Sequence, residues 1–147
     1  MRRVFIEREK CQICLSCMIA CMTAHRKEPS SDYDLYNNKS IESRNYIRYQ
    51  DGNSAPVFCR HCDDPECAAA CMSGALQKNP ESGHVLYDKE RCGQCFMCVM
   101  SCHFGLPRPD SVSRSEMVKC DFCTGIADSP SCASACPTET ITVKEVT

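Results

Sequence analysis

The sequence predicts a small α+β protein in which short β-hairpins and helical turns are duplicated within one domain. Three observations predict it. Sixteen of the 147 residues are cysteine, and they occur in four groups of four. Only 25 residues are Leu, Ile, Val or Phe, and there is no Trp, so such residues fall below the roughly 20% that an ordinary apolar core needs. The length suggests a single domain. We therefore expect something bound to the cysteines to complete the interior.

The composition excludes several classes of protein. With 17 Lys and Arg against 19 Asp and Glu, the formal net charge is −2, which provides no basic surface for nucleic acid. No apolar stretch reaches the roughly 18 residues that a transmembrane helix needs. The cysteine content leaves two classes, a disulfide-rich secreted domain and an intracellular metal protein.

The N-terminal residues predict an edge strand over Arg3–Glu7. Met1-Arg2-Arg3 superficially resembles the start of a twin-arginine export signal. A signal continues with an apolar segment and a cleavage site, whereas here Arg8-Glu9-Lys10 leads directly into Cys11. We therefore expect a cytoplasmic protein, in which thiols stay reduced and bind metal.

The four cysteine groups share one pattern. Each ends with two cysteines separated by three residues, and the gap before this pair is two, four, two or eight residues. The groups are Cys11, Cys14, Cys17 and Cys21; Cys59, Cys62, Cys67 and Cys71; Cys92, Cys95, Cys98 and Cys102; and Cys120, Cys123, Cys132 and Cys136. An insertion confined to one place in a repeated motif is typical of a loop that bulges from a fixed frame of ligands.

This pattern favours iron–sulfur clusters. Three thiolates within seven residues can hold three corners of a cubane cluster, and the fourth ligand then comes from elsewhere in the chain. In two-cluster bacterial ferredoxins the last cysteine of each run binds the other cluster. Sixteen thiolates divide into four [4Fe–4S] clusters with none left over. Zinc is the first alternative, although all-cysteine zinc sites usually combine two separated Cys-x2-Cys pairs. Disulfides are the second.

The residues between the groups predict two ferredoxin-like units within a single polyferredoxin domain, residues 1–147. The segments after Cys71 and after Cys136 both resemble the turn by which a ferredoxin chain leaves its cluster and enters a strand. Residues 84–88 alternate as a strand should, and residues 79–83 form the preceding turn. We expect an inner unit over residues 57–103. An outer unit is split around it, over residues 1–24 and 118–147, with strands at Arg3–Glu7 and Thr140–Glu145.

Residues 25–56 form an insertion without a metal motif. It contains Tyr33, Tyr36, Tyr46 and Tyr49, and residues 45–49 predict a short strand followed by a turn at residues 51–53. Because Tyr and Arg are enriched at interfaces, one hypothesis is that the insertion docks a partner. The alternative is a solvated loop.

Three segments resemble a known family. Cys59-Arg60-His61-Cys62-Asp63-Asp64-Pro65-Glu66-Cys67, Cys95-Phe96-Met97-Cys98-Val99-Met100-Ser101-Cys102 and Lys119-Cys120-Asp121-Phe122-Cys123 are similar to the four-cluster [4Fe–4S] ferredoxin-like electron-transfer subunits of anaerobic oxidoreductases. That family serves formate dehydrogenases, hydrogenases, tungsten aldehyde oxidoreductases and carbon monoxide dehydrogenases. The second segment and Cys71-Met72-Ser73-Gly74-Ala75 most resemble the ferredoxin subunit associated with carbon monoxide dehydrogenase.

The resemblance implies a set of four cysteines for each cluster, three from one group and one from another. The implied sets are Cys11, Cys14, Cys17 and Cys136; Cys120, Cys123, Cys132 and Cys21; Cys59, Cys62, Cys67 and Cys102; and Cys92, Cys95, Cys98 and Cys71. The chain departs from the ferredoxin pattern at Met22, Met72 and His103, which stand where a ferredoxin usually has Pro. His103 is either a residue that tunes its cluster or a solvent-facing replacement.

The resemblance also implies a function. The chain would relay low-potential electrons from a catalytic oxidoreductase, best matched by carbon monoxide dehydrogenase, to a ferredoxin, a flavin NAD(P)H oxidoreductase or a hydrogenase. It would not be an enzyme itself, because ligation by cysteine alone leaves no iron open to substrate. The alternatives are the same role in a formate dehydrogenase, hydrogenase or tungsten aldehyde oxidoreductase complex, a free polyferredoxin, a cluster-based redox sensor and a zinc scaffold.

Overall fold

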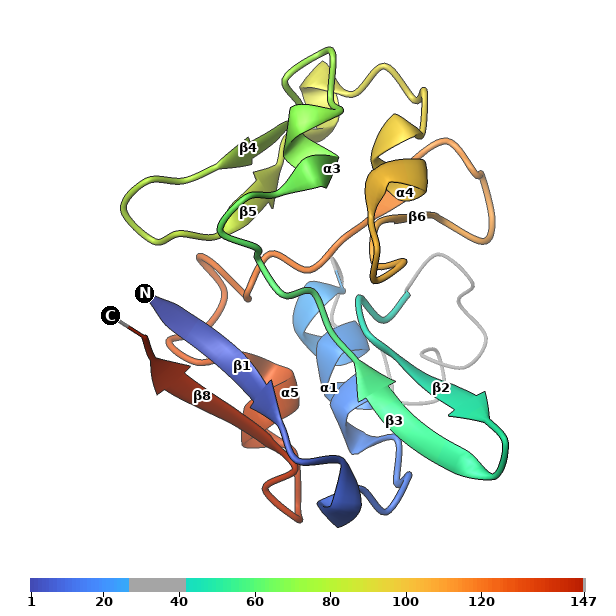
Figure 1. Cartoon of the computed structure of the whole chain (residues 1–147), viewed down its shortest axis with the longest axis vertical. Helices are drawn as coiled ribbons and strands as arrows, with labels where there is room; N and C mark the ends of the chain where they lie inside the picture. Colours follow the sequence, from blue (N-terminus) through green and yellow to red (C-terminus); the bar gives the residue numbers. More distant parts are fainter. Residues whose placement is uncertain (27–41, 147) are drawn as a thin grey trace.

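The structure, a computed structural model, describes residues 1–26 and 42–146. Within these ranges the strands pair into four separate two-stranded antiparallel sheets, with short helices between them (Figure 1). The strands are β1 (Arg2–Ile6), β2 (Tyr46–Gln50), β3 (Asn53–Val57), β4 (Leu76–Lys78), β5 (Val85–Tyr87), β6 (Arg108–Pro109), β7 (Met117–Val118) and β8 (Ile141–Glu145). The helices are α1 (Ser16–His25), α3 (Glu66–Ala69), α4 (Met97–Ser101) and α5 (Ser131–Ser134), with 3-10 helices η1 (Arg8–Lys10) and η2 (Lys89–Arg91). This mixture confirms the α+β class.

The two ends of the chain form one sheet. Strand β1 runs antiparallel to β8, with Arg2 opposite Glu145 and Ile6 opposite Ile141. The predicted strands Arg3–Glu7 and Thr140–Glu145 are therefore confirmed to within one residue. Helix α1 packs against α5 in the same half of the molecule, the lower half in Figure 1. This pairing brings the first cysteine group next to the fourth.

Three antiparallel strand pairs lie between these ends, and the shortest is β6–β7. Strands β4 and β5 form the predicted hairpin, and its turn closes where the Gly83 N–H donates to the Asn79 carbonyl. Strands β2 and β3 form the hairpin of the insertion, whose turn residues Asp51 and Gly52 have φ of 50° and 77°. Two successive residues of positive φ are typical of the tight turn that matches strand twist. The sequence predicted β2 and its turn but not β3.

The first and third cysteine groups share one local backbone conformation. Each begins directly after a 3-10 helix, and Cys11 (φ −72°, ψ 118°) has nearly the same dihedral angles as Cys92 (φ −73°, ψ 119°). The residue before the next α-helix is left-handed in both groups, with φ of 62° at Leu15 and 55° at Phe96. Such a conformation costs about 1–3 kcal/mol for a residue with a side chain and clusters at functional sites. The chain therefore turns sharply around each of these groups.

The second and fourth groups share a different conformation. Helices α3 and α5 each have four residues, and they begin directly after Pro65 and Pro130. In the inner part of the chain α3 packs against α4, as α5 packs against α1 in the other half. Each half therefore combines one group of each conformation.

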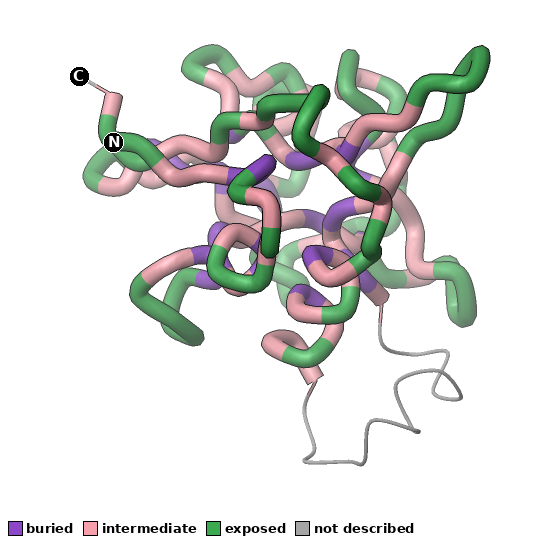
Figure 2. Tube along the Cα trace, turned by 90° about the horizontal axis from the view of Figure 1, so that it is seen from below, coloured by how far each residue is buried: buried purple, intermediate pink, exposed green. Residues whose placement is uncertain are grey.

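The apolar core is divided into two small clusters. One is centred on Phe58 and Ile141 with Cys17 and Cys132, and the other on Leu76, Val85 and Met117. Figure 2 shows that the buried segments are short and lie between exposed loops. Cysteines belong to or pack against both clusters, as expected for a chain with few large aliphatic residues.

Candidate iron–sulfur cluster sites

All sixteen cysteines lie within the described residues, and none forms a disulfide. Two small cavities are each lined by four of them. Cys11, Cys14, Cys17 and Cys136 line the first cavity, beside Ile47 and Pro56 of the β2–β3 hairpin. The pairing of β1 with β8 positions Cys136, which comes from the far end of the sequence. These four are one of the sets implied by the resemblance.

The second cavity is lined by Cys71, Cys92, Cys95 and Cys98. Cys71 reaches it from the turn before β4, where its Sγ accepts a hydrogen bond from the Leu76 N–H at 3.4 Å. Thus the last cysteine of the second group lies among the first three of the third group, which is the second implied set.

The remaining cysteines also lie near their implied partners. Burial raises the pKa of the Cys67 thiol to about 11, and the charges of Cys59, Cys102 and Cys62 contribute to this increase. Burial likewise raises the pKa of Cys132, with further contributions from Cys120, Cys21 and Cys123 of the same implied set and from Cys17 of the neighbouring one. Groups that influence one another in this way lie close together. The cavities thus bring together two of the four sets, and the mutual electrostatic influence is consistent with the other two.

The chemistry of these sites fits bound iron. Burial also raises the pKa of Cys17 to about 11 and that of Cys120 to about 12, because a buried thiolate is costly without a positive charge beside it. Iron supplies that charge, and cysteine thiolates are the ligands that hold [4Fe–4S] clusters. All of the cysteines except the exposed Cys14 and Cys95 are buried or half-buried, so sets of four such thiols are suited to a cluster.

Backbone N–H groups point at several sulfurs. The Arg44 N–H donates to Cys21 Sγ at 3.3 Å, and the Phe122 N–H donates to Cys120 Sγ at 3.4 Å. Hydrogen bonds to cluster sulfurs and the burial of the cluster are the main protein influences on its potential. Arg44 comes from the insertion, so the insertion contributes directly to a candidate site.

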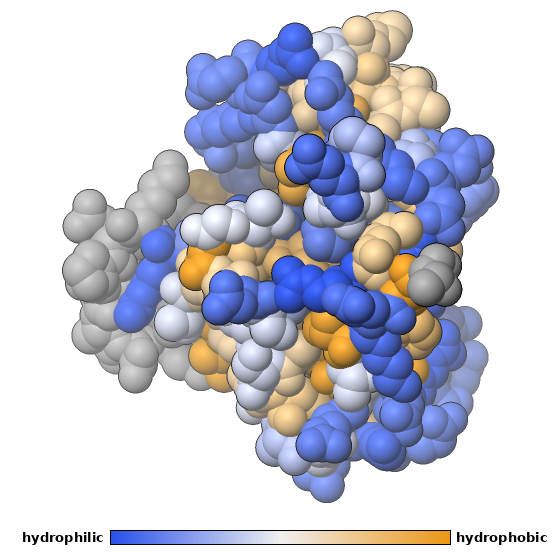
Figure 3. Space-filling model, turned by 90° about the vertical axis from the view of Figure 1, so that its left-hand side faces the viewer, coloured by the Kyte–Doolittle hydropathy of each residue, from blue (hydrophilic) through white to orange (hydrophobic). Residues whose placement is uncertain are grey.

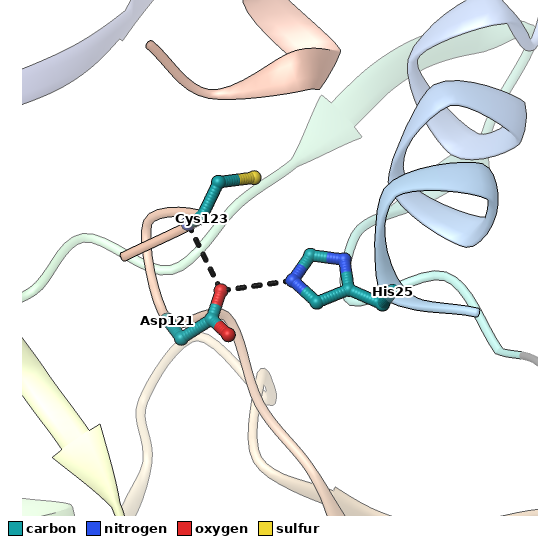
Figure 4. A group of neighbouring side chains, drawn as sticks. All are labelled: His25, Asp121 and Cys123. Carbon is teal, nitrogen blue, oxygen red and sulfur yellow. Dashed lines mark hydrogen bonds and ion pairs between the residues drawn. The ribbon is translucent and has the colours of Figure 1, made fainter. Parts of the chain in front are cut away.

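A polar network adjoins Cys21 at the end of α1, and Figure 4 shows its members His25, Asp121 and Cys123. His25 donates from Nδ1 to the Cys21 carbonyl at 2.8 Å and from Nε2 to Asp121 Oδ1 at 3.0 Å. Asp121 also forms an ion pair with Arg44 and accepts from the Cys123 N–H at 2.9 Å.

The charged groups of this network stabilise one another. Burial disfavours the charged form of His25, but its hydrogen bonds to Asp121 and Cys21 raise its pKa to about 10. Burial would raise the pKa of Asp121, but the hydrogen bond from His25 and the charge of Arg44 hold that pKa well below its usual range. Sequence reasoning missed Asp121 and Arg44, because their contact joins residues that lie far apart in the chain.

Three aromatic rings lie together between the two halves of the molecule. His84 stacks on Phe122 with ring centroids 4.0 Å apart, and His61 meets the Phe122 ring edge-on at 5.7 Å. His61 Nδ1 accepts from the Val85 N–H at 3.0 Å, and its buried Nε2 has no hydrogen-bond partner among the described residues. His61 precedes Cys62, and Phe122 precedes Cys123, so these rings connect neighbouring candidate sites.

A large cleft, of about 870 Å³, lies beside the β2–β3 hairpin. Three arginines, Arg8, Arg48 and Arg60, line it and outnumber the two carboxylates, Glu9 and Asp51; Tyr46 and Cys102 line it as well. The insertion therefore forms one wall of a basic cleft that reaches a candidate cluster ligand. Tyr49 is exposed, whereas Tyr33 and Tyr36 lie outside the described residues.

The rest of the surface combines hydrophobic and hydrophilic residues. On the face in Figure 3, hydrophobic residues form separate groups among hydrophilic ones. Met72 is exposed. The His103 side chain is 77% exposed, as expected for a solvent-facing replacement of Pro, and its Nε2 lies 3.0 Å from Glu66 Oε1. No helix within residues 1–26 and 42–146 is both long and apolar enough to span a membrane.

Comparison with known proteins agrees with this geometry. An iron–sulfur protein of Rhodospirillum rubrum is 32% identical over 94% of this chain and 79% of its own length. The electron transport protein HydN of Escherichia coli is 29% identical over 95% of this chain and 86% of its own. The B subunit of the anaerobic dimethyl sulfoxide reductase of Escherichia coli is 29% identical over 90% of this chain and 68% of its own. Residues 50–146 match the model of the 4Fe–4S dicluster domain, and the chain therefore belongs to that family.

Proposed function

We propose that the chain is an electron-transfer subunit that holds four [4Fe–4S] clusters and catalyses no reaction of its own. The observation that carries this proposal is the pair of cavities lined by four cysteines each, three from one group and one from another. The clusters supply one-electron transfer when bound. The residues of the chain hold them, limit the access of water and donate hydrogen bonds to their sulfurs.

The proposed ligand sets are the four given above, and they imply an internal duplication. The inner unit, residues 57–103, would hold the two clusters of the second and third groups. The outer unit, residues 1–24 and 118–147, would hold the other two. The repeated backbone of the first and third groups and of the second and fourth supports this arrangement.

The proposed partner is a catalytic oxidoreductase, from which the chain accepts low-potential electrons. The relatives named above include an electron transport protein and a subunit of a reductase, which supports this class of partner. Carbon monoxide dehydrogenase is the specific proposal, supported by the resemblance of residues 71–75 and 95–102. Formate dehydrogenase, hydrogenase and tungsten aldehyde oxidoreductase are the alternatives, as is a free polyferredoxin.

The basic cleft is the proposed exit for electrons. It is lined by three arginines against two carboxylates and by Cys102, a proposed ligand. An acceptor with an acidic docking face, such as a ferredoxin, complements this charge, and such complementarity mainly increases the rate of association.

The experiment is anaerobic electron transfer in the purified holoprotein. The expected result is reduction of its clusters by carbon monoxide dehydrogenase with CO, followed by transfer to an oxidised ferredoxin. Arg48→Glu should slow the second step about tenfold or more at low salt, because like charges repel at the docking face. Arg114→Glu, an exposed change outside the cleft, is the control. If formate dehydrogenase or hydrogenase reduced the clusters and carbon monoxide dehydrogenase did not, that enzyme would be the partner instead. If none of these enzymes reduced the clusters, the relay function would be contradicted.

A further inference from the structure

Lys119 is a buried cation without an acidic partner. Its exposed fraction is 3%. Its Nζ donates to the Val85 carbonyl at 2.6 Å and to the Cys120 carbonyl at 2.9 Å. Among the ion pairs of residues 1–26 and 42–146, none includes Lys119. A buried ammonium group normally requires a compensating negative charge, because removal from water is costly.

The position of Lys119 indicates where that negative charge lies. It directly precedes Cys120 and donates to the carbonyl of that residue. Val85, whose carbonyl is its other acceptor, belongs to the side-chain cluster against which Cys67 packs. Cys67 belongs to the proposed inner set with Cys59, Cys62 and Cys102, and Cys120 belongs to an outer set. The ring of His61, which lies between Cys59 and Cys62 in the sequence, meets the ring of Phe122, two residues after Cys120. Lys119 is therefore located where an inner and an outer site adjoin.

We propose that Lys119 is the shared counter-ion of these two clusters and raises the reduction potential of both. The proposal rests on the proposed function, since it requires the clusters to be present. Reduction of either cluster adds one electron, donated by the catalytic partner. The net charge of the cluster with its four thiolates changes from −2 to −3, and no bond is made or broken. A nearby buried cation stabilises the more negative state, and its effect is weakly screened by salt.

The consequence is an ordered relay. The two clusters beside Lys119 would join the inner unit to the outer unit. An electron that enters through the outer unit and leaves at the cleft beside Cys102 would therefore pass this point. Higher potentials at the junction favour the electron there over the two more distant sites. The rings of His61 and Phe122 pack at the same junction, and they limit the water that would otherwise weaken the field of Lys119.

The experiment compares cluster potentials in the holoprotein by redox titration monitored by electron paramagnetic resonance. Lys119→Gln removes the charge and keeps a donor for one carbonyl. At a fixed ambient potential we expect about a tenfold lower ratio of reduced to oxidised cluster at two of the four clusters, equivalent to about 59 mV for one electron. Lys119→Arg keeps the charge and should retain the wild-type potentials.

Lys78 provides the matched control. Its Nζ also donates to two carbonyls, those of Cys62 and Asp63, at 3.1 and 2.6 Å. It is paired with Asp63, however, and its side chain is 27% exposed. Lys78→Gln should therefore shift the potentials little, and less at high salt, whereas the shift in Lys119→Gln should persist.

The outcomes separate this inference from the proposed function. Wild-type protein without clusters would contradict the proposed function. Unchanged potentials in a fully assembled Lys119→Gln variant would contradict the role of Lys119 alone, as would equal shifts in the Gln and Arg variants. If Lys119→Gln and Lys119→Met both fail to bind iron, the Lys119→Arg variant tests the proposal. An Arg variant that assembles all clusters with wild-type potentials would show that the site requires a positive charge. An Arg variant that also fails to bind iron would show that the site requires the shape of lysine, and this would overturn the proposal.

Discussion

At the residue scale, the spacing of the cysteines carries most of what the sequence could predict. The regular Cys-x2-Cys-x2-Cys runs identified the candidate ligands, because three thiolates on a short turn suit a cubane. The resemblance implied that Cys71 and Cys136 each join three cysteines of a different group. In the two cavities these cysteines lie beside those neighbours. The roles of Asp121 and Lys119 could not be predicted, because both depend on contacts between distant segments.

The exchange of cysteines between groups gives a direct prediction. Cys71→Ser should perturb the same cluster signal as Cys98→Ser, since both line one cavity. It should leave intact the signal that Cys67→Ser perturbs, although Cys67 is nearer in sequence. Electron paramagnetic resonance of the reduced variants makes the comparison. If Cys71→Ser instead matched Cys67→Ser, each group would bind its own cluster.

The network at the end of α1 gives a second prediction. Asp121→Asn removes the charge that holds His25 and Arg44, and it places an amide donor where Arg44 needs an acceptor. We expect the free energy of unfolding to fall by about 1–3 kcal/mol, as for the loss of other partly buried hydrogen bonds to charged groups. The thermal midpoint, measured anaerobically by circular dichroism, reports this change.

The control for Asp121 is Asp63, which forms an ion pair with Arg3 but is 71% exposed. Exposed pairs contribute little to stability, so Asp63→Asn should leave the thermal midpoint nearly unchanged. Equal effects of the two substitutions would show that burial of the α1 network has no energetic importance.

At the scale of elements, the sequence predicted the strands that have either alternation or a clear turn beside them. Strands β1, β5 and β8 and the turn at residues 51–53 belong to this class. The β6–β7 pair was missed, because each strand has only two residues and β6 contains Pro109. Strand β3 was missed because Pro56 lies within it. A proline cannot donate to a sheet and is found mainly at edges, which suits a two-stranded hairpin.

The turn of the β2–β3 hairpin provides a prediction at this scale. Gly52 has φ of +77° and open space around the position of a Cβ atom. Gly52→Ala should therefore cost about 1 kcal/mol through backbone strain alone. Gly52→Asn should cost less, since Asn tolerates the left-handed conformation. Thermal midpoints that fall equally in both variants would contradict this explanation.

At the scale of the whole molecule, the scarcity of large aliphatic residues and the abundance of cysteine have one explanation. The core consists of two small clusters of side chains with cysteines in or beside both. Bound clusters would therefore complete the interior. The sequence predicted this from composition. It could not predict how the halves adjoin, because rings and a lysine from different segments form that junction.

Removal of iron should consequently unfold the protein. Without metal, the sixteen thiols lose the bonds that hold distant segments together, and in such proteins the free energy of metal binding contributes directly to folding. We expect iron-free, fully reduced protein to give a poorly dispersed NMR spectrum and greatly reduced circular dichroism. A well-dispersed spectrum of the iron-free protein would show that the side chains alone specify the fold.

The central claim is that all sixteen cysteines hold four [4Fe–4S] clusters. The most direct measurement is the content of iron and acid-labile sulfide per chain in anaerobically purified protein. The account predicts about sixteen iron and about sixteen sulfide per chain. About eight of each would leave half of the cysteines without a cluster, and zinc in place of iron and sulfide would replace the clusters with a structural scaffold. Either result would contradict the account.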